Sequence, residues 1–222
     1  MANFNYQDLG IKDYKECWDY QEKLLEEVQT VKKSGHQPTD KNYFLLVEHP
    51  HVYTLGKSGD EHNLLIQPEF LKKIHATYYR INRGGDITYH GPGQLVGYPI
   101  IDLEYYHLGV KDFIHRMEEA IIAVVARYGI KGERKEGAIG VWIAPNDPAK
   151  GRKICAIGVR VSRYVSMHGF ALNVNTDMRY FNYINPCGFQ SFGVSSIEQE
   201  LGHAVDFEEV SRLTRKKFNE LF

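Results

Sequence analysis

The sequence lacks any hydrophobic run close to the roughly 20 residues that a helix needs to span a bilayer. Its start, residues 1–6, also lacks the basic stretch and apolar core of a secretion signal. Cysteine is scarce. Cys17, Cys155 and Cys187 form an odd set without a disulfide-like spacing, which favours a reducing compartment. These absences predict a cytoplasmic protein with no membrane partner.

Neither sign of charge is in excess, because 27 Lys and Arg residues accompany 28 Asp and Glu residues. We therefore expect no nucleic-acid partner. Metal-binding patterns are also missing, and His49-Pro50-His51 does not place two imidazoles on one helix face. Gly56-Lys57-Ser58 resembles the end of a phosphate loop, but His51 stands where its leading glycine belongs. The sequence predicts no metal and no cofactor.

The composition is that of an ordinary globular protein: 43% of the 222 residues are hydrophobic, enough for one sizeable core. Apolar residues at helical spacing predict long helices over residues 13–33 and 110–128 and a short helix over 69–75. Capping signals at 195–198 and 206–209 predict two C-terminal helices. Strand-like stretches occupy residues 42–48, 52–55, 77–81, 95–101, 138–143, 154–161 and 164–174.

Gly97 and Pro99 mark the strand predicted over 95–101 as irregular or as an edge strand. Most predicted strands follow one another directly, with only two long helices among them. We therefore expect a single α/β domain over residues 1–222, with a mixed, largely antiparallel sheet flanked by helices.

The three thiols differ in their surroundings. Cys17 lies on the apolar stripe of a predicted helix and Cys155 inside a predicted strand, so both are expected to be small core residues. Cys187 stands between a proline and a glycine, where the chain turns and can present a side chain at the edge of a cleft. It is a candidate nucleophile, although loop thiols of this kind are often incidental.

The segment from Arg83 to Gln94 is rich in glycine and in hydrogen-bonding groups. Its glycines permit backbone conformations closed to other residues, and Thr88, Tyr89 and His90 add polar groups. Arg83 has the fork geometry that binds a carboxylate or a phosphate. A tight turn is the plain alternative. Together with a loop thiol, this segment favours acyl transfer through a thioester.

Small residues line one face of each of two adjacent predicted strands: Ala156 and Gly158 on the first, Gly169 and Ala171 on the second. Four small side chains would leave a groove in which an extended acyl chain could lie. Close packing of a helix over the same glycines is the alternative.

A thiol with a pKa of roughly 8.5 needs a nearby cation or base to react at neutral pH, and Lys153 is the candidate. In a regular strand its side chain shares a face with Cys155 and Ile157, away from Ala156 and Gly158. A bulge near Cys155, or a strand that begins after Lys153, is needed to bring it to their side. The alternative is a solvated lysine just before the strand.

Motifs in a fixed order resemble the octanoyltransferases of lipoate biosynthesis, over roughly residues 40–200. Their residues are Glu48-His49-Pro50, Tyr53-Thr54-Leu55-Gly56, Arg83-Gly84-Gly85-Asp86-Ile87-Thr88-Tyr89-His90-Gly91-Pro92-Gly93-Gln94-Leu95-Val96-Gly97-Tyr98-Pro99, Lys153-Ile154-Cys155-Ala156-Ile157-Gly158-Val159, His168-Gly169-Phe170-Ala171-Leu172-Asn173 and Pro186-Cys187-Gly188. The resemblance implies the fold of the biotin- and lipoate-protein ligase catalytic domains.

The resemblance also implies an activity and its partners. An octanoyl group would pass from octanoyl-acyl carrier protein to a lysine of lipoyl domains, in 2-oxo acid dehydrogenase complexes and in the glycine cleavage H protein. Cys187 would be the acyl-thioester nucleophile and Lys153 the residue that lowers the thiol pKa, and Lys153 or His90 would accept the proton of the target lysine. The implied substrate-binding residues are Arg83, Gly84, Gly85, Asp86, Ile87, Thr88, Tyr89, His90, Ala156, Ile157, Gly158, Gly169, Phe170 and Ala171.

Three alternatives remain at this point. An ATP-dependent lipoate or octanoate ligase of the same fold would form an adenylate with Mg²⁺ and would not need Cys187. A non-catalytic acyl-binding module would bind without transfer and leave Lys153 and Cys187 without a purpose. A thiol hydrolase would prefer water to an amine as the acceptor.

Overall fold

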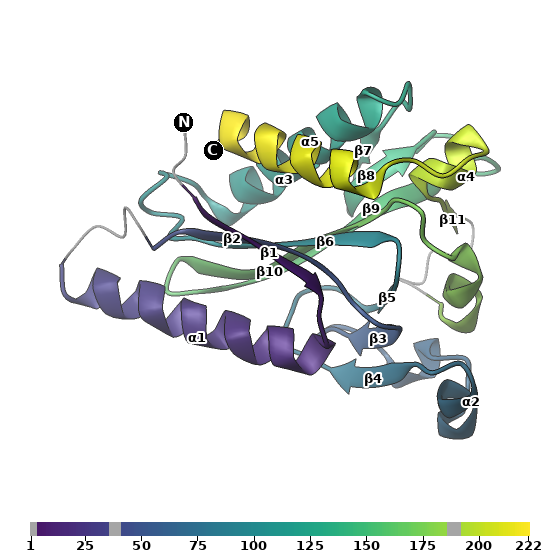
Figure 1. The fold of residues 1–222 in the computed structure, drawn as a ribbon, viewed down its shortest axis with the longest axis horizontal. Helices are drawn as coiled ribbons and strands as arrows, with labels where there is room; N and C mark the ends of the chain where they lie inside the picture. The colour runs from purple at the N-terminus through teal and green to yellow at the C-terminus, as the bar shows by residue number, and fades with distance from the viewer. Residues whose placement is uncertain (1–3, 36–40, 186–191) are drawn as a thin grey trace.

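The computed structural model describes residues 4–35, 41–185 and 192–222. They form one large and one small β-sheet, with helices on both sides of the large sheet (Figure 1). The strands are β1 (Asn5–Ile11), β2 (Tyr43–Glu48), β3 (Val52–Leu55), β4 (Thr77–Arg80), β5 (Ile87–His90), β6 (Gln94–Ile100), β7 (Glu133–Lys135), β8 (Ala138–Ile143), β9 (Arg152–Ser162), β10 (Val165–Asn173) and β11 (Gly193–Val194). The helices are α1 (Tyr14–Lys33), α2 (Pro68–Lys73), α3 (Val110–Ala126), α4 (Ile197–Leu201) and α5 (Phe207–Leu221), with 3₁₀ turns η1 (Glu61–Asn63) and η2 (Met178–Tyr183).

The large sheet has the strand order β1-β2-β6-β10-β9-β8-β7, and β11 adds to it beside β9. Within it, β1 pairs with β2 and β11 with β9 in parallel, while the other pairs are antiparallel. The small sheet has the order β4-β3-β5. The prediction of a mixed, largely antiparallel sheet flanked by helices is confirmed.

Helices cover both faces of the large sheet (Figure 1). On one face α3 and α5 bury Phe113 and Phe218 against Phe170 of β10. On the other face α1 packs Leu25 against Val96 of β6. Burial of such apolar side chains supplies most of the stabilisation of a fold of this kind, at about 25 cal/mol per Å².

Three helices begin at a capped N-terminus, and the caps of α4 and α5 lie within the predicted segments 195–198 and 206–209, whereas the cap of α1 was not predicted. Asp13 caps α1 by accepting hydrogen bonds from the N–H groups of Lys15 and Glu16. Ser196 caps α4, and Asp206 caps α5 in the same way. Each cap satisfies helix N–H groups that have no partner within the helix.

Two expectations differ from the structure. First, β6 is central rather than an edge strand, because it pairs with β2 and β10. Its irregularity is real: the ladder with β10 stops at Gly97, and the Ser166 hydroxyl takes over by donating to the Pro99 carbonyl and accepting from Ile101 N–H. Second, the segment expected as a loop from Arg83 to Gln94 contains β5. None of the helices in the described residues has both the length and the apolar character needed to cross a membrane.

Candidate active site

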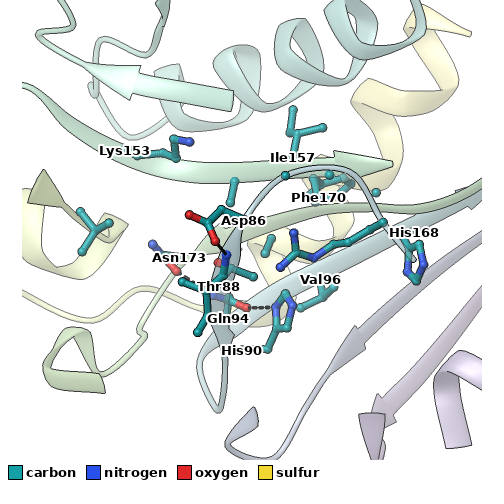
Figure 2. Close-up of a pocket in the computed structure, with 18 of the residues that line it drawn as sticks. Asp86, Thr88, His90, Gln94, Val96, Lys153, Ile157, His168, Phe170 and Asn173 are labelled. Carbon is teal, nitrogen blue, oxygen red and sulfur yellow. Dashed lines mark hydrogen bonds between the residues drawn. The ribbon is translucent and has the colours of Figure 1, made fainter. Parts of the chain in front are cut away.

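A pocket lies where the small sheet meets β6, β9 and β10 of the large sheet. Figure 2 shows Lys153 toward one end of it and His168 toward the other, with Asp86 and Thr88 between them. The predicted site residues that line it are Arg83, Gly84, Gly85, Asp86, Ile87, Thr88, His90, Lys153, Ala156, Ile157, Gly158, Gly169, Phe170 and Ala171.

Tyr89 does not join that lining. Its ring is fully buried in the cluster of the small sheet with Tyr53 and Phe181, and its hydroxyl lies 2.7 Å from Nδ1 of His51. The period of a strand explains this, since Thr88 and His90 face the pocket while Tyr89 between them faces away.

Arg83 supports the loop with its guanidinium. Nη2 donates to the Thr54 carbonyl at 2.6 Å and to Thr54 Oγ1 at 3.0 Å, and Nη1 donates to the Gly84 carbonyl at 2.9 Å. The side chain is buried. The guanidinium therefore binds the protein's own backbone, whereas the sequence suggested that it would bind a carboxylate or a phosphate.

His90 is buried and neutral. Its Nδ1 donates to Gln94 Oε1 at 2.8 Å, and its Nε2 faces Thr54 Oγ1 at 3.4 Å. Burial, with His49 nearby, lowers the pKa of His90 to about 3. Such an imidazole is a very weak base at neutral pH, so the geometry does not suit His90 as the proton acceptor.

A chain of aligned hydrogen bonds crosses the floor of the pocket. In each link a donor group points to the next residue, which fixes the tautomer of His90 and the orientation of both amides. The residues, in order, are Arg83, Thr54, His90, Gln94, Asn173 and the Ser195 carbonyl. Sequence reasoning did not select Gln94 and Asn173 as site residues, although two amides in apolar strands were a signal.

The four small residues lie directly opposite one another. Gly158 pairs with Gly169, and Ala156 pairs with Ala171, on neighbouring strands β9 and β10. A methyl group on Gly158 would come within 2.9 Å of the Gly84 carbonyl oxygen, and one on Gly169 within 2.1 Å of the Gly97 carbonyl oxygen. The small residues therefore both line the pocket and allow close backbone approach.

Lys153 reaches the pocket because β9 contains a bulge. Val141 of β8 pairs with Cys155, but the next residue, Trp142, pairs with Lys153, so Ile154 is an extra residue in the ladder. Ile154 and Cys155 are both buried in the core above the sheet. Because of the extra residue, the Lys153 side chain lies on the same face of the strand as Ala156. Such a bulge near Cys155 is one of the two ways in which the sequence predicted that Lys153 could come to this side.

Cys17 and Cys155 are buried, which confirms them as core residues. Burial raises the pKa of Cys17 to about 12 and raises the pKa of Cys155 as well, so both thiols stay protonated. Cys187, the predicted nucleophile, lies outside the described residues, so the distance between its sulfur and Lys153 Nζ stays untested. The described residues contain no cluster of three His, Cys, Asp or Glu side chains placed to hold a metal ion.

The chain that follows Cys187 is described from Phe192 onward, and it attaches to the strand of Lys153. Phe192 lines the pocket. Val194 of β11 pairs with Lys153, and Ser195 N–H donates to the Lys153 carbonyl at 3.0 Å. Trp142 also lines the pocket, and nothing in the sequence marked it.

A model of the lipoyl protein ligase A/B catalytic domain matches residues 13–219, and the chain belongs to this family. Solved structures share the fold. An archaeal lipoate protein ligase from Thermoplasma acidophilum has a TM-score of 0.68 at 15% identity, covering 99% of this chain and 84% of its own. A lipoate-protein ligase A bound with ATP has a TM-score of 0.68 at 16% identity, covering 99% and 85%. A biotin protein ligase from Aquifex aeolicus has a TM-score of 0.53 at 12% identity, covering 98% and 69%.

Relatives with higher sequence identity show to which group of this family the chain belongs. The octanoyltransferase of Christiangramia forsetii is 53% identical over 97% of this chain and 94% of its own length. That of Parabacteroides distasonis is 51% identical over the whole of both chains, and that of Bacteroides fragilis is 55% identical over 94% of each. Within the family the chain is therefore one of the octanoyltransferases, acyltransferases that act in protein lipoylation.

Proposed function

We propose that the protein moves an octanoyl group from octanoyl-acyl carrier protein to a lysine of lipoyl domains through a thioester on Cys187, with Lys153 as its catalytic partner. The acceptors are the lipoyl domains of 2-oxo acid dehydrogenase complexes and the glycine cleavage H protein. The observation that carries the proposal is the attachment of the chain after Cys187 to Lys153, through Val194 and Ser195, beside the pocket of small residues.

In the first half-reaction the Cys187 thiolate attacks the carbonyl carbon of the donor thioester. The bond to the carrier sulfur breaks, and the carrier leaves as a thiol after taking a proton from the Lys153 ammonium, which becomes a neutral amine. The Lys153 ammonium stabilises the thiolate, and each unit of thiol pKa depression is worth about 1.4 kcal/mol. Backbone N–H groups near Gly158 or in the Gly-rich segment hold the negative oxygen.

In the second half-reaction the amine of the target lysine attacks the octanoyl thioester. An amide bond forms, the bond to Cys187 Sγ breaks, and the proton of the attacking nitrogen passes to Lys153 Nζ. Lys153 suits this step better than His90, whose ring nitrogens both face partners and whose pKa is about 3.

The test is mass spectrometry after incubation with an octanoyl-carrier donor alone. The wild-type protein should gain one octanoyl group, Cys187→Ser should gain none and lose turnover, and Cys17→Ala should still form the adduct. Transfer at the full rate with no adduct would contradict the covalent scheme. Activity of Cys187→Ala from free octanoate and ATP would instead select an ATP-dependent ligase.

A further inference from the structure

The ammonium groups of two lysines lie over the ring of Trp142. Lys153 Nζ lies 4.6 Å from its centroid and Lys135 Nζ lies 5.9 Å from it. Both nitrogens are therefore within roughly 10 Å of each other, close enough for each charge to affect the other. A cation over an indole face is attracted by the ring quadrupole.

Trp142 is held rigidly for this task. Its backbone pairs with Lys153 at the bulge, so both side chains project from adjacent positions. Its Nε1 donates to the Ala138 carbonyl at 3.0 Å, and Phe192 packs edge-on against the ring at 5.7 Å. The side chain is buried, and the ring lines the pocket.

Lys135 is anchored at the same place. From β7 its Nζ donates to the Pro145 carbonyl at 2.6 Å and lies 4.0 Å from the centroid of Phe192. One ammonium thus joins the segment after β8 to the aromatic pair of Trp142 and Phe192.

We propose that Trp142 positions the amine of Lys153 and that Lys135 keeps this amine easy to deprotonate, so that it can accept a proton in the second half-reaction. The inference rests on the proposed role of Lys153. The indole fixes the nitrogen but also favours its charged form. A second cation beside the same ring opposes that charged form, since like charges raise each other's free energy.

Among the residues that the structure describes, further charged groups near Lys153 belong to α3 and to the lining of the pocket. From α3, the Glu118 carboxylate accepts hydrogen bonds from Gly140 N–H at 3.0 Å and from Arg134 Nε at 3.0 Å. Glu118 and Lys153 both act on the pKa of the buried Cys155 thiol, which Glu118 raises and Lys153 lowers. The titratable groups that share the pocket are Tyr14, Arg83, Asp86, His90, Tyr98 and His168. All of them remain in the variants below, so a difference between variants reports Lys135 or Trp142.

The experiment isolates the octanoyl-enzyme and measures its single-turnover reaction with a lipoyl domain as a function of pH. Loss of the Lys135 charge raises the pKa of Lys153, so the rate should reach half its maximum about 1 pH unit higher in Lys135→Met. Lys135→Arg keeps the charge and should keep the wild-type midpoint. Lys131→Met removes an exposed lysine next to β7 and should also keep it. A Lys135→Met midpoint equal to wild type would overturn the proposal.

Positioning is tested by Trp142→Leu and by the more conservative Trp142→Phe. Both should still accept the octanoyl group, but Trp142→Leu should transfer it at least tenfold more slowly, with Trp142→Phe between it and wild type. Equal transfer rates in folded variants would overturn this role. The proposed function fails separately: if Lys153→Ala transfers normally, or if no adduct forms on the wild-type protein, both proposals fall before any variant of Trp142 is made.

Discussion

At the scale of single residues, the charged side chain of Arg83 binds the protein's own backbone, although the sequence suggested that it binds an anion. Its guanidinium is buried and donates to the Thr54 and Gly84 carbonyls and to Thr54 Oγ1. From there the hydrogen-bond chain continues to His90, so the shape of the pocket floor depends on this arginine. Arg83, which was selected from the sequence because its charge could bind an anion, thus stabilises the shape of the pocket through hydrogen bonds within the protein.

Replacing Arg83 should therefore cost stability as well as activity. Arg83→Met removes the guanidinium donors to the Thr54 carbonyl, Thr54 Oγ1 and the Gly84 carbonyl, which should lower the free energy of unfolding by about 2–4 kcal/mol in a urea titration. Arg83→Lys should recover only part of this loss, because an ammonium cannot reproduce the fork. Arg80→Met removes an exposed arginine paired with Glu61 and should cost no more than about 1 kcal/mol. Equal losses at both positions would contradict this account.

At the scale of elements, the bulge in β9 determines which side chains share the pocket. Gly140 of β8 lies beside it with a φ of 121°. A methyl group there would come within 2.5 Å of the Cys155 carbonyl oxygen. Neither strand can move away easily, because Gly140 N–H is also bound by Glu118.

Gly140→Ala should disturb the bulge and with it the position of Lys153. We expect a loss of at least about 2 kcal/mol of stability and a large loss of octanoyl transfer. Gly137→Ala is the matched control, because Gly137 also has a positive φ, 73°, but a methyl group there meets nothing within 4 Å. It should cost only about 1 kcal/mol and leave the activity intact. Thermal unfolding and activity assays of the two variants check this, and similar behaviour of both would argue against the bulge.

Strong periodicity made the long elements predictable. The helix expected over 13–33 is α1, and the strand expected over 52–55 is β3 at the same bounds. By contrast, β1 was missed because its residues are largely polar and it lies at the edge of the sheet, where pairing with β2 leaves much of it exposed. β11 has only two residues and gives no pattern at all.

For the site, most of the residues predicted from the sequence line the pocket, but the sequence did not indicate how they come together. The alternation of Ala156, Gly158, Gly169 and Ala171 predicted a groove, and their direct pairing across β9 and β10 supports that interpretation. The bulge that turns Lys153 toward the groove depends on pairing between β8 and β9, which no local pattern encodes. Trp142 was missed for the same reason, since only the pairing of β8 with β9 brings it next to Lys153.

At the scale of the whole molecule, three imidazoles are buried where the pocket, α1 and the two sheets come together. His49 donates from Nδ1 to the Lys12 carbonyl and accepts from the Tyr98 hydroxyl. Burial lowers the pKa of His49 to about 4, and burial lowers the pKa of His168 and of His90 to about 3. All three must gain a proton when the chain unfolds below pH 6.5 or so.

Acid should therefore destabilise the fold well before the carboxylates titrate. Below a pH of about 6.5 the unfolded chain binds more protons than the folded chain, so the free energy of unfolding should fall as the pH falls toward 4. Each histidine contributes a slope of up to about 1.4 kcal/mol per pH unit. Urea titrations between pH 7 and 4 measure this slope. His49→Asn should reduce it, whereas replacement of the exposed His62 by Gln should not. A free energy of unfolding that stays constant over this interval would mean that the three buried rings take up protons without opening the region where the sheets meet.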